Sequence, residues 1–392
     1  MKKKKILIVQ LLSNGDCLFV TTIARQIKEV DYPDCHLTWM IASRCKQVLI
    51  NNPHVDEVIE IPVTDNFRDR QRIPELIQNT GQSFDKIIIT ENAGENIKYF
   101  YGTFRMGYFR TYDKEITVPI APVIALLPEE IANVTAFAEQ YSLNDKNYYN
   151  VLVECGPLSE QSRMNIDMAL KIFNFVSHKK KNIKFILSCK KIDCELPTNV
   201  FDGSVLSWRE NAELTKYCDL LIGCSSGITW IGTSTWAKEL PMLQIINQDY
   251  GWKVTTASVE YDFMYWGLNR DNLIELDDKD EHKIMDCAHE IITNSVAIAK
   301  KKYPGREAMT KEQLNAYFAE HATRNFFAYI HSTICPDLKQ ESPQYIKQTF
   351  KLLCFLIARK IYLKSGLKAL RNRNLAVNKL IIKLKDVLSP SG

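Results

Sequence analysis

Short apolar runs alternate with amphipathic segments through the first third of the chain. The runs of strand length are Lys5–Val9, His36–Ile41, Glu57–Ile61 and Lys86–Thr90. Between them, Leu18–Val30 and Arg44–Asn51 repeat their apolar positions at helical spacing. Strands that alternate with helices in this way are typical of βαβ units around a parallel sheet. The pattern predicts one α/β domain over residues 1–140.

The same alternation starts again near residue 150. The expected strands are Tyr149–Glu154, Ile183–Ser188, Ser204–Leu206, Leu220–Gly223 and Leu243–Ile246, and the expected helices are Ile166–His178 and Ala212–Tyr217. The polar, turn-prone stretch Ser142–Asn147 separates the two series. We therefore expect a second α/β domain over residues 148–300, with a central ligand-binding cleft between the two domains.

Beyond Asp280 the strand signal disappears and the pattern becomes helical, over Glu281–Lys302 and Thr310–His331. We expect a helical segment over residues 301–341 and a basic amphipathic helical tail over residues 342–392. The tail carries eleven Lys and Arg residues against one acidic residue, Asp386, which gives it a net charge of +10. Because the whole chain carries +4, the first 341 residues carry −6.

The charge of this tail leaves two interpretations open. A basic amphipathic helix binds the surface of an anionic membrane, where each Lys or Arg contributes about 1 kcal/mol. The alternative is a helix packed on the body of the protein with its basic face in water. Nucleic acid is not an expected partner, because the body is acidic and no nucleic-acid-binding motif occurs in the chain.

The composition is that of a globular protein, with 46% apolar and 24% charged residues among 392. The eleven cysteines are odd in number and form no CxxC pair, which favours a reducing compartment over a disulfide framework. No segment has the apolar length of a signal peptide or a membrane span. We expect a cytoplasmic protein, peripheral on the inner face of the cytoplasmic membrane if its tail binds lipid.

The turn Ser13-Asn14-Gly15-Asp16 follows the first predicted strand. It is neither a GxGxxG dinucleotide fingerprint nor a P-loop. A carboxylate at the carboxyl end of a strand can take a proton from a substrate hydroxyl, so Asp16 is a candidate general base. The alternative is that Asp16 is a helix N-cap that accepts from the backbone N–H groups of residues 18 and 19.

Two further patches could bind a phosphorylated ligand. The turn Ser225-Ser226-Gly227 follows a buried strand and is expected to offer free backbone N–H groups to a diphosphate. The loop after Glu154 contains Gly156, Ser159, Ser162 and Arg163, whose hydroxyls and guanidinium suit phosphate oxygens. The alternatives are a capped helix start for the turn and a solvated surface loop for the second patch.

A metal requirement is not expected. The seven histidines form no HExxH motif, and His282 and His289 are expected to be surface or packing residues. The acidic residues closest to a DxD pair, which would hold a divalent ion on a nucleotide-sugar, are Asp277, Asp278 and Asp280, and they are expected in a turn after the last strand. A serine hydrolase is not indicated either, since the Ser225 turn is not a GxSxG nucleophile elbow.

The order of these motifs resembles family 9 glycosyltransferases, the bacterial ADP-heptose:lipopolysaccharide heptosyltransferase superfamily. Members begin with a strand, a serine-glycine-aspartate turn and a helix, as Ile6–Arg25 does here. They continue with a Tyr-Pro-Asp turn and an Asn-Pro-x-Val-Asp-x-Val segment, matched by Tyr32–Asp34 and Asn52–Val58. The resemblance covers about residues 4–250.

This resemblance implies a GT-B architecture of two Rossmann-like domains, to which the sequence pattern adds a C-terminal helical extension. It implies an inverting, metal-independent glycosyltransferase without a cofactor, in which Asp16 is the general base and Ser13, Asn14 and Gly15 lie on the acceptor side. Donor binding falls to Gly156, Ser159, Ser162, Arg163, Ser225, Ser226 and Gly227. The partners would be a nucleoside diphosphate sugar and a glycan or glycolipid acceptor in lipopolysaccharide, capsule or protein glycan assembly.

The sequence departs from the family pattern on the donor side. Ser225 stands where an aspartate is usual and Trp230 where a histidine is usual, and the spacing to Glu239-Leu240-Pro241 is about three residues longer. The identity of the donor sugar is therefore open. Two other functions also stay open: a non-catalytic nucleotide-sugar-binding protein, and a GT-B nucleotide-sugar epimerase.

Overall fold

The computed structural model describes residues 3–63, 72–92, 96, 99–157, 161–247, 257–277 and 279–319. All of these residues belong to one compact unit that spans residues 1–322. The expected tail 342–392, and residues 320–341 of the helical segment before it, lie outside the described residues.

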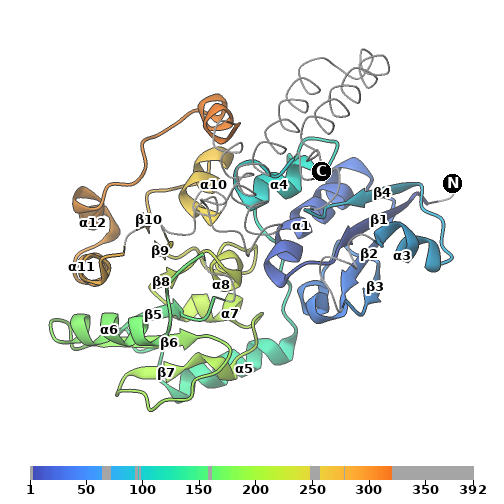
Figure 1. Ribbon diagram of the computed structural model, residues 1–392. Helices are drawn as coiled ribbons and strands as arrows, with labels where there is room; N and C mark the ends of the chain where they lie inside the picture. The colour runs from blue at the N-terminus through green and yellow to red at the C-terminus, as the bar shows by residue number, and fades with distance from the viewer. Residues whose placement is uncertain are drawn as a thin grey trace, which may run out of the picture. The chain divides into compact units, whose positions relative to one another are not determined.

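The first sheet has four parallel strands in the order β3-β2-β1-β4 (Figure 1, blue). The strands are β1 Lys5–Gln10, β2 His36–Ala42, β3 Glu57–Ile61 and β4 Lys86–Ile89. The apolar run of β1 is buried on both faces: Ile6 and Ile8 join one core cluster, and Leu7 and Val9 join another. A strand covered on both sides reads as a continuous apolar run, which explains why the pattern located it.

The second sheet has six parallel strands in the order β10-β9-β8-β5-β6-β7 (Figure 1, green to yellow). The strands are β5 Tyr149–Glu154, β6 Ile183–Ser188, β7 Val200–Asp202, β8 Leu220–Gly223, β9 Met242–Ile245 and β10 Leu273–Leu276. The predicted α/β class with two parallel sheets is confirmed, and the arrangement is consistent with the GT-B architecture.

Helices connect the strands in each half. They are α1 Asn14–Gln26, α3 Ile73–Asn79, α4 Phe104–Arg110, α5 Pro128–Gln140, α6 Ile166–Ser177, α7 Asn211–Leu214, α8 Gly227–Ile231, α10 Val259–Trp266, α11 Glu281–Thr293 and α12 Val296–Lys302. Residues 311–319 are also helical. The predicted helix over Arg44–Asn51 is a 3-10 helix, Ser43–Leu49, and α1 begins four residues earlier than predicted and ends in a π-helical turn, Ile27–Asp31.

The predicted strand Ser204–Leu206 is wrong. Strand β7 ends at Asp202, whose side chain accepts a hydrogen bond of 2.8 Å from the N–H of Ser204. This capping contact starts the 3-10 helix Gly203–Val205, and Val205 is 69% exposed. The apolar character of the segment therefore reflects a surface valine and not a buried strand.

Helix α5 contacts residues of the second half of the chain, although it lies wholly within residues 1–140, the range expected for the first domain. Its Asn133 donates a hydrogen bond of 2.9 Å to Glu210, and Glu130 pairs with the buried Arg209. Just after the helix, the Tyr141 ring stacks on Phe201 at a centroid distance of 4.3 Å. The domain limits expected from the sequence stay predictions.

Within the part of the chain that is described, no helix combines the length and the apolar character needed to cross a membrane.

Candidate functional site

Asp16 lies just beyond the carboxyl end of β1, in the first turn of α1. Its Oδ2 accepts two hydrogen bonds from Ser13, one from the N–H at 3.0 Å and one from the hydroxyl at 2.6 Å. Its Oδ1 accepts a third from the hydroxyl of Tyr108 at 2.5 Å. Asp16 is half-buried, so an ordered carboxylate stands at the edge of the first sheet.

The alternative that Asp16 is the N-cap of its helix is wrong. Ser13 is the N-cap residue, and Asp16 is the third residue of the helix, where its side chain accepts from the N–H of Ser13. A carboxylate in this position also interacts favourably with the helix dipole. Ser13 is exposed, and Asn14 and Gly15 are half-buried beside it, so the expected acceptor-side residues do adjoin the carboxylate.

Tyr108 is a contact of Asp16 that the sequence analysis missed. It comes from α4, 92 residues further along the chain, and its side chain is buried. The Phe100 ring meets it edge-on at 5.0 Å, and the Phe19 ring stacks on it at 6.1 Å. Burial, and then the negative charge of Asp16, raise the pKa of the Tyr108 phenol well above its ordinary value. The phenol is therefore a permanent hydrogen-bond donor.

Helix α4 is tied to the second half of the protein by a buried ion pair. The Arg105 guanidinium donates from Nε to Oδ2 of Asp262 in α10 at 2.9 Å, and both side chains are fully buried. Thr103 donates to the other oxygen of Asp262 at 2.8 Å. Tyr108 is thus carried on a helix whose first turn is fixed to α10.

Trp230, where the family pattern has a histidine, is a packing residue here. Its ring meets Phe19 of α1 at a centroid distance of 4.8 Å in a T-shaped contact, and it is 6% exposed. The Arg105 guanidinium lies 5.0 Å from its centroid. Helix α1, which begins beside Asp16, therefore packs directly on α8, which begins at the Ser226 turn.

The turn after β8 is held by the protein itself. Ser225 has a left-handed backbone conformation, with φ of 54°, and its hydroxyl donates to the carbonyl of Ala257. Its N–H donates to Oε1 of Gln244 at 3.0 Å, and its carbonyl accepts from Gln161 at 2.6 Å. Residues from three separate segments therefore impose this conformation on Ser225.

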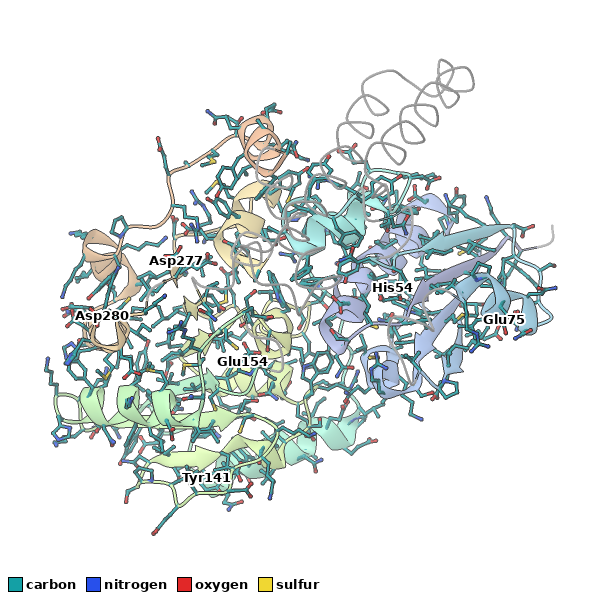
Figure 2. All side chains as sticks on the ribbon, in the orientation of Figure 1. His54, Glu75, Tyr141, Glu154, Asp277 and Asp280 are labelled. Atoms are coloured by element: carbon teal, nitrogen blue, oxygen red, sulfur yellow. The ribbon has the colours of Figure 1, made fainter. Side chains whose placement is uncertain are left out.

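Glu154, which is labelled in Figure 2, is the acceptor for four donors in and just after this turn. Its carboxylate is 2% exposed and stands at the end of β5. It accepts four hydrogen bonds of 2.6 to 3.0 Å, from Cys224 N–H, Ser226 hydroxyl, Ile228 N–H and Thr229 hydroxyl. Our expectation that the turn presents free donors to a diphosphate is wrong for these groups and for Ser225, because protein oxygens already occupy them.

The loop after β5 divides between buried and exposed residues. The hydroxyl of Ser162 donates a hydrogen bond of 2.5 Å to the carbonyl of Ile245, and this bond connects the loop to β9. Arg163 is exposed, and its Nε donates to Asn247 at 3.1 Å. Gly156 is exposed and closely approaches Cys189, since a Cβ on it would lie 2.9 Å from the Cβ of that residue. Ser159 lies outside the described residues.

Two cysteines lie beside each other at this loop. Cys155 is buried and Cys189 is half-buried. A hydrogen bond from the Cys155 thiol lowers the pKa of Cys189 to about 7, whereas the same contact together with burial raises the pKa of Cys155. Cys189 is therefore the thiolate-forming member of the pair.

No protein family model matches this chain, and no curated protein sequence matches it. Among solved structures, it is similar to a family 9 glycosyl transferase from Veillonella parvula, with 13% identity, a TM-score of 0.49, and coverage of 82% of this chain and 98% of that one. It is also similar to the ADP-heptose lipopolysaccharide heptosyltransferase II of E. coli, with 12% identity, a TM-score of 0.48, and coverage of 81% and 99%. A putative UDP-N-acetylglucosamine 2-epimerase from Listeria monocytogenes gives 9% identity, a TM-score of 0.44, and coverage of 86% and 98%. These likenesses do not assign a reaction to the chain.

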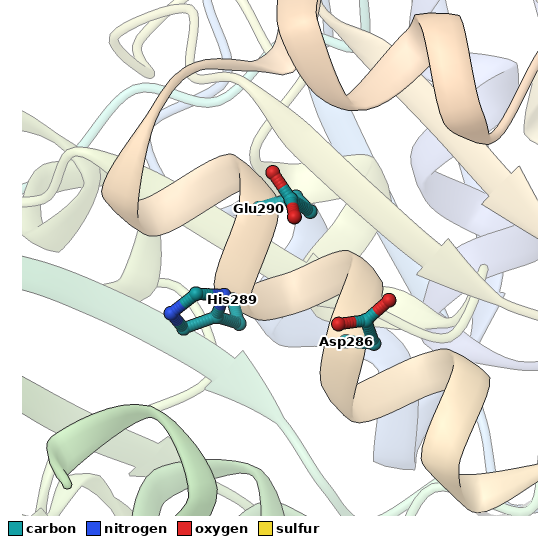
Figure 3. Close-up of side chains that lie close together, drawn as sticks. All are labelled: Asp286, His289 and Glu290. Atoms are coloured by element: carbon teal, nitrogen blue, oxygen red, sulfur yellow. The ribbon is translucent and has the colours of Figure 1, made fainter. Parts of the chain in front are cut away.

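One group of metal-ligand types occurs among the described residues, on α11 (Figure 3). Asp286, His289 and Glu290 bring one ligand atom each within 4.8 Å of the others. Asp286 is already bonded to Lys302 and to the hydroxyl of Tyr303. Both contacts are made to Oδ2, so a cation held by this cluster would lie close to the positive charge of Lys302, and the cluster is better described as part of the α11–α12 contact.

A cavity of about 370 Å³ opens at the edge of the second sheet where the amino ends of its strands lie. It is lined by Tyr149 at the start of β5, by Pro241 and Asn272 just before β9 and β10, and by residues 291–297. Asp16, Glu154 and the Ser225 turn lie at the carboxyl ends of their strands, so none of them lines this cavity.

Proposed function

We propose that this protein is a glycosyltransferase that moves a sugar from a nucleoside diphosphate donor to a glycan acceptor. The observation that carries the proposal is the contact of Phe19 with Trp230, whose rings are 4.8 Å apart. This contact joins α1, which begins beside the Asp16 carboxylate, to α8, which begins at the turn after β8. The resemblance of both motifs and their order to family 9 supports the same activity.

Asp16 is the proposed general base. The acceptor hydroxyl attacks the anomeric carbon from the face opposite the diphosphate, and Asp16 takes the proton of that hydroxyl as the new C–O bond forms. The bond to the diphosphate breaks at the same time, so the product has the inverted configuration. Ser13, Asn14 and Gly15 adjoin Asp16 and are proposed to line the acceptor side.

The donor is proposed to bind at the loop after β5 and the turn after β8. Arg163 is exposed there and is the proposed cation for the departing diphosphate, which makes a metal ion unnecessary. Gly156 permits close approach of the loop, and Ser225, Ser226 and Gly227 form the wall of the site. Glu154 and Gln244 fix the backbone of this turn, because they accept hydrogen bonds from the N–H groups of Cys224 and Ser225.

A membrane-linked glycan or glycolipid is the proposed acceptor class. Its support is the basic tail 342–392, whose net charge of +10 suits an anionic membrane surface. The assembly of lipopolysaccharide, capsule or protein glycan would supply such an acceptor at the inner face of the cytoplasmic membrane.

The test is a screen of nucleoside diphosphate sugars by thermal shift, followed by turnover with the donor that binds. A ligand that binds only the folded state raises the unfolding midpoint. Asp16→Asn should retain the thermal shift and lose turnover by at least about a hundredfold. Asp31→Asn is the matched control, because Asp31 also accepts from a buried tyrosine, Tyr112, but lies at the other end of α1.

Three outcomes would contradict the proposal. Near-normal turnover by Asp16→Asn would remove Asp16 as the base. Donor binding without release of nucleotide would favour a binding protein. Conversion of the donor sugar without any acceptor would favour an epimerase.

A further inference from the structure

We propose that Tyr108 is the positioning residue of the base, and that it makes Oδ1 of Asp16 the oxygen that receives the acceptor's proton. This inference rests on the proposed function, because it assigns a role within that reaction. It concerns a residue that no sequence motif marks and that reaches the site from a distant helix.

The distribution of donors around Asp16 distinguishes its two oxygens. A carboxylate oxygen can accept about two hydrogen bonds. Oδ2 accepts two, from the N–H and the hydroxyl of Ser13. Oδ1 accepts one from the described residues, from Tyr108. An incoming hydroxyl therefore meets a saturated Oδ2 and an Oδ1 with room for one further hydrogen bond.

The phenol cannot take over the role of the base. Its pKa is raised well above the ordinary value by burial and by the charge of Asp16, so it keeps its proton. It donates to the ionised carboxylate and stabilises that form, and it fixes the plane of the carboxylate. Oδ1 of Asp16, which accepts the hydrogen bond from Tyr108, is thus held in a fixed orientation and keeps room for the proton of the substrate.

The surroundings of Tyr108 hold the phenol in place. Phe100 and Phe19 contact its ring on two sides. Gly107 allows this packing, because a Cβ there would collide with the Phe100 ring. The Arg105–Asp262 ion pair and the Thr103–Asp262 hydrogen bond fix the helix one turn earlier. The position of the hydroxyl is therefore set before any substrate binds.

Tyr108→Phe tests the role directly. We expect kcat/KM to fall about tenfold, as for loss of one hydrogen bond to a charged group, with an unchanged thermal shift by the donor. The loss should fall on kcat, with the KM of the donor unchanged, because the hydrogen bond orients the base and does not contact the donor. A tyrosine that only fills the core would not produce this split between kcat and KM.

Tyr112→Phe is the matched control. Tyr112 is also buried, and its hydroxyl donates to Asp31 at 2.6 Å, so the variant loses the same kind of phenol–carboxylate bond. It should lose similar stability and leave kcat unchanged. If Tyr108→Phe does not fold, 3-fluorotyrosine at position 108 replaces it, since this more acidic phenol is a stronger donor and should change kcat while leaving the KM of the donor unchanged.

The double variant Asp16→Asn, Tyr108→Phe separates this inference from the proposed function. If Tyr108 acts through Asp16, its substitution should have no further effect on kcat/KM in the Asp16→Asn background. Additive losses, or an unchanged kcat in Tyr108→Phe, would overturn the role of Tyr108 while leaving Asp16 as the base. Absence of turnover by the wild-type protein with every donor would instead overturn the proposed function.

Discussion

Arg105 and Asp262 form an ion pair in which both side chains are fully buried. Arg105 comes from α4 after the first sheet, and Asp262 comes from α10 in the second half of the chain. The pair also receives a hydrogen bond from Thr103 and lies beside the ring of Trp230. Residues 157 positions apart in the sequence are therefore connected through one desolvated contact.

We expect Asp262→Ala to lower the free energy of unfolding by about 3 to 5 kcal/mol, because it leaves the Arg105 guanidinium buried without its partner. Urea denaturation followed by circular dichroism measures the change. Glu281→Ala is the control, since its pair with Lys171 is about half exposed and should contribute little. A loss below about 1 kcal/mol in Asp262→Ala would show that Arg105 finds another acceptor or reaches water.

Gly223→Ala should damage the turn after β8. A Cβ at this position would lie 2.5 Å from Nε2 of Gln244 and would also collide with the hydroxyl of Thr229. We expect a stability loss of about 1 to 3 kcal/mol and weaker donor binding, measured by urea denaturation and thermal shift.

Gly15→Ala is the control for this substitution, because the nearest atom to its Cβ, Oγ of Ser13, is 4.0 Å away. Alanine inside a helix is favoured over glycine, so this variant should be at least as stable as the wild type. Equal stability of the two variants would contradict the crowding at Gly223. Loss of turnover in Gly15→Ala without loss of stability would indicate close approach of the acceptor there.

Alkylation by iodoacetamide should distinguish Cys189 from the other cysteines. Its pKa is about 7, so its reaction rate should rise with a midpoint near pH 7. Cys155→Ala removes the thiol that donates to Cys189, and the midpoint should then move to higher pH. Peptide mass spectrometry after timed alkylation gives both values, with the exposed Cys194 as an internal reference. A wild-type midpoint above about pH 8 would contradict the pairing.

The strands could be predicted where the sheets are buried on both faces. The apolar runs at Tyr149–Glu154 and Leu220–Gly223 coincide with β5 and β8 as predicted. The segment Ser204–Leu206 was misassigned because its apolar residues do not indicate whether they are buried. The side chain of Asp202 decides the local structure, and its capping contact has no periodic signature.

The site was only partly predictable for a related reason. Asp16 follows a strand directly, so its place at a sheet edge follows from the order of the elements. Tyr108 and Glu154 act through partners 92 and about 70 positions away, which depend on how the helices pack. A strand that ends in a charged Glu154 after a buried run was the available signal, because a carboxylate there needs several donors.

Glu154 also gives a criterion for interpreting the sequences of related chains. Its four donors would need another acceptor if the residue at this position were neutral, and an anion from solution is the simplest one. With a glutamate at this position the protein itself supplies the negative charge that these four groups need, so a diphosphate that reaches the turn has to be held by other groups, such as the proposed Arg163. A small neutral residue at this position in a related chain would leave the four groups to the negative charge of the ligand.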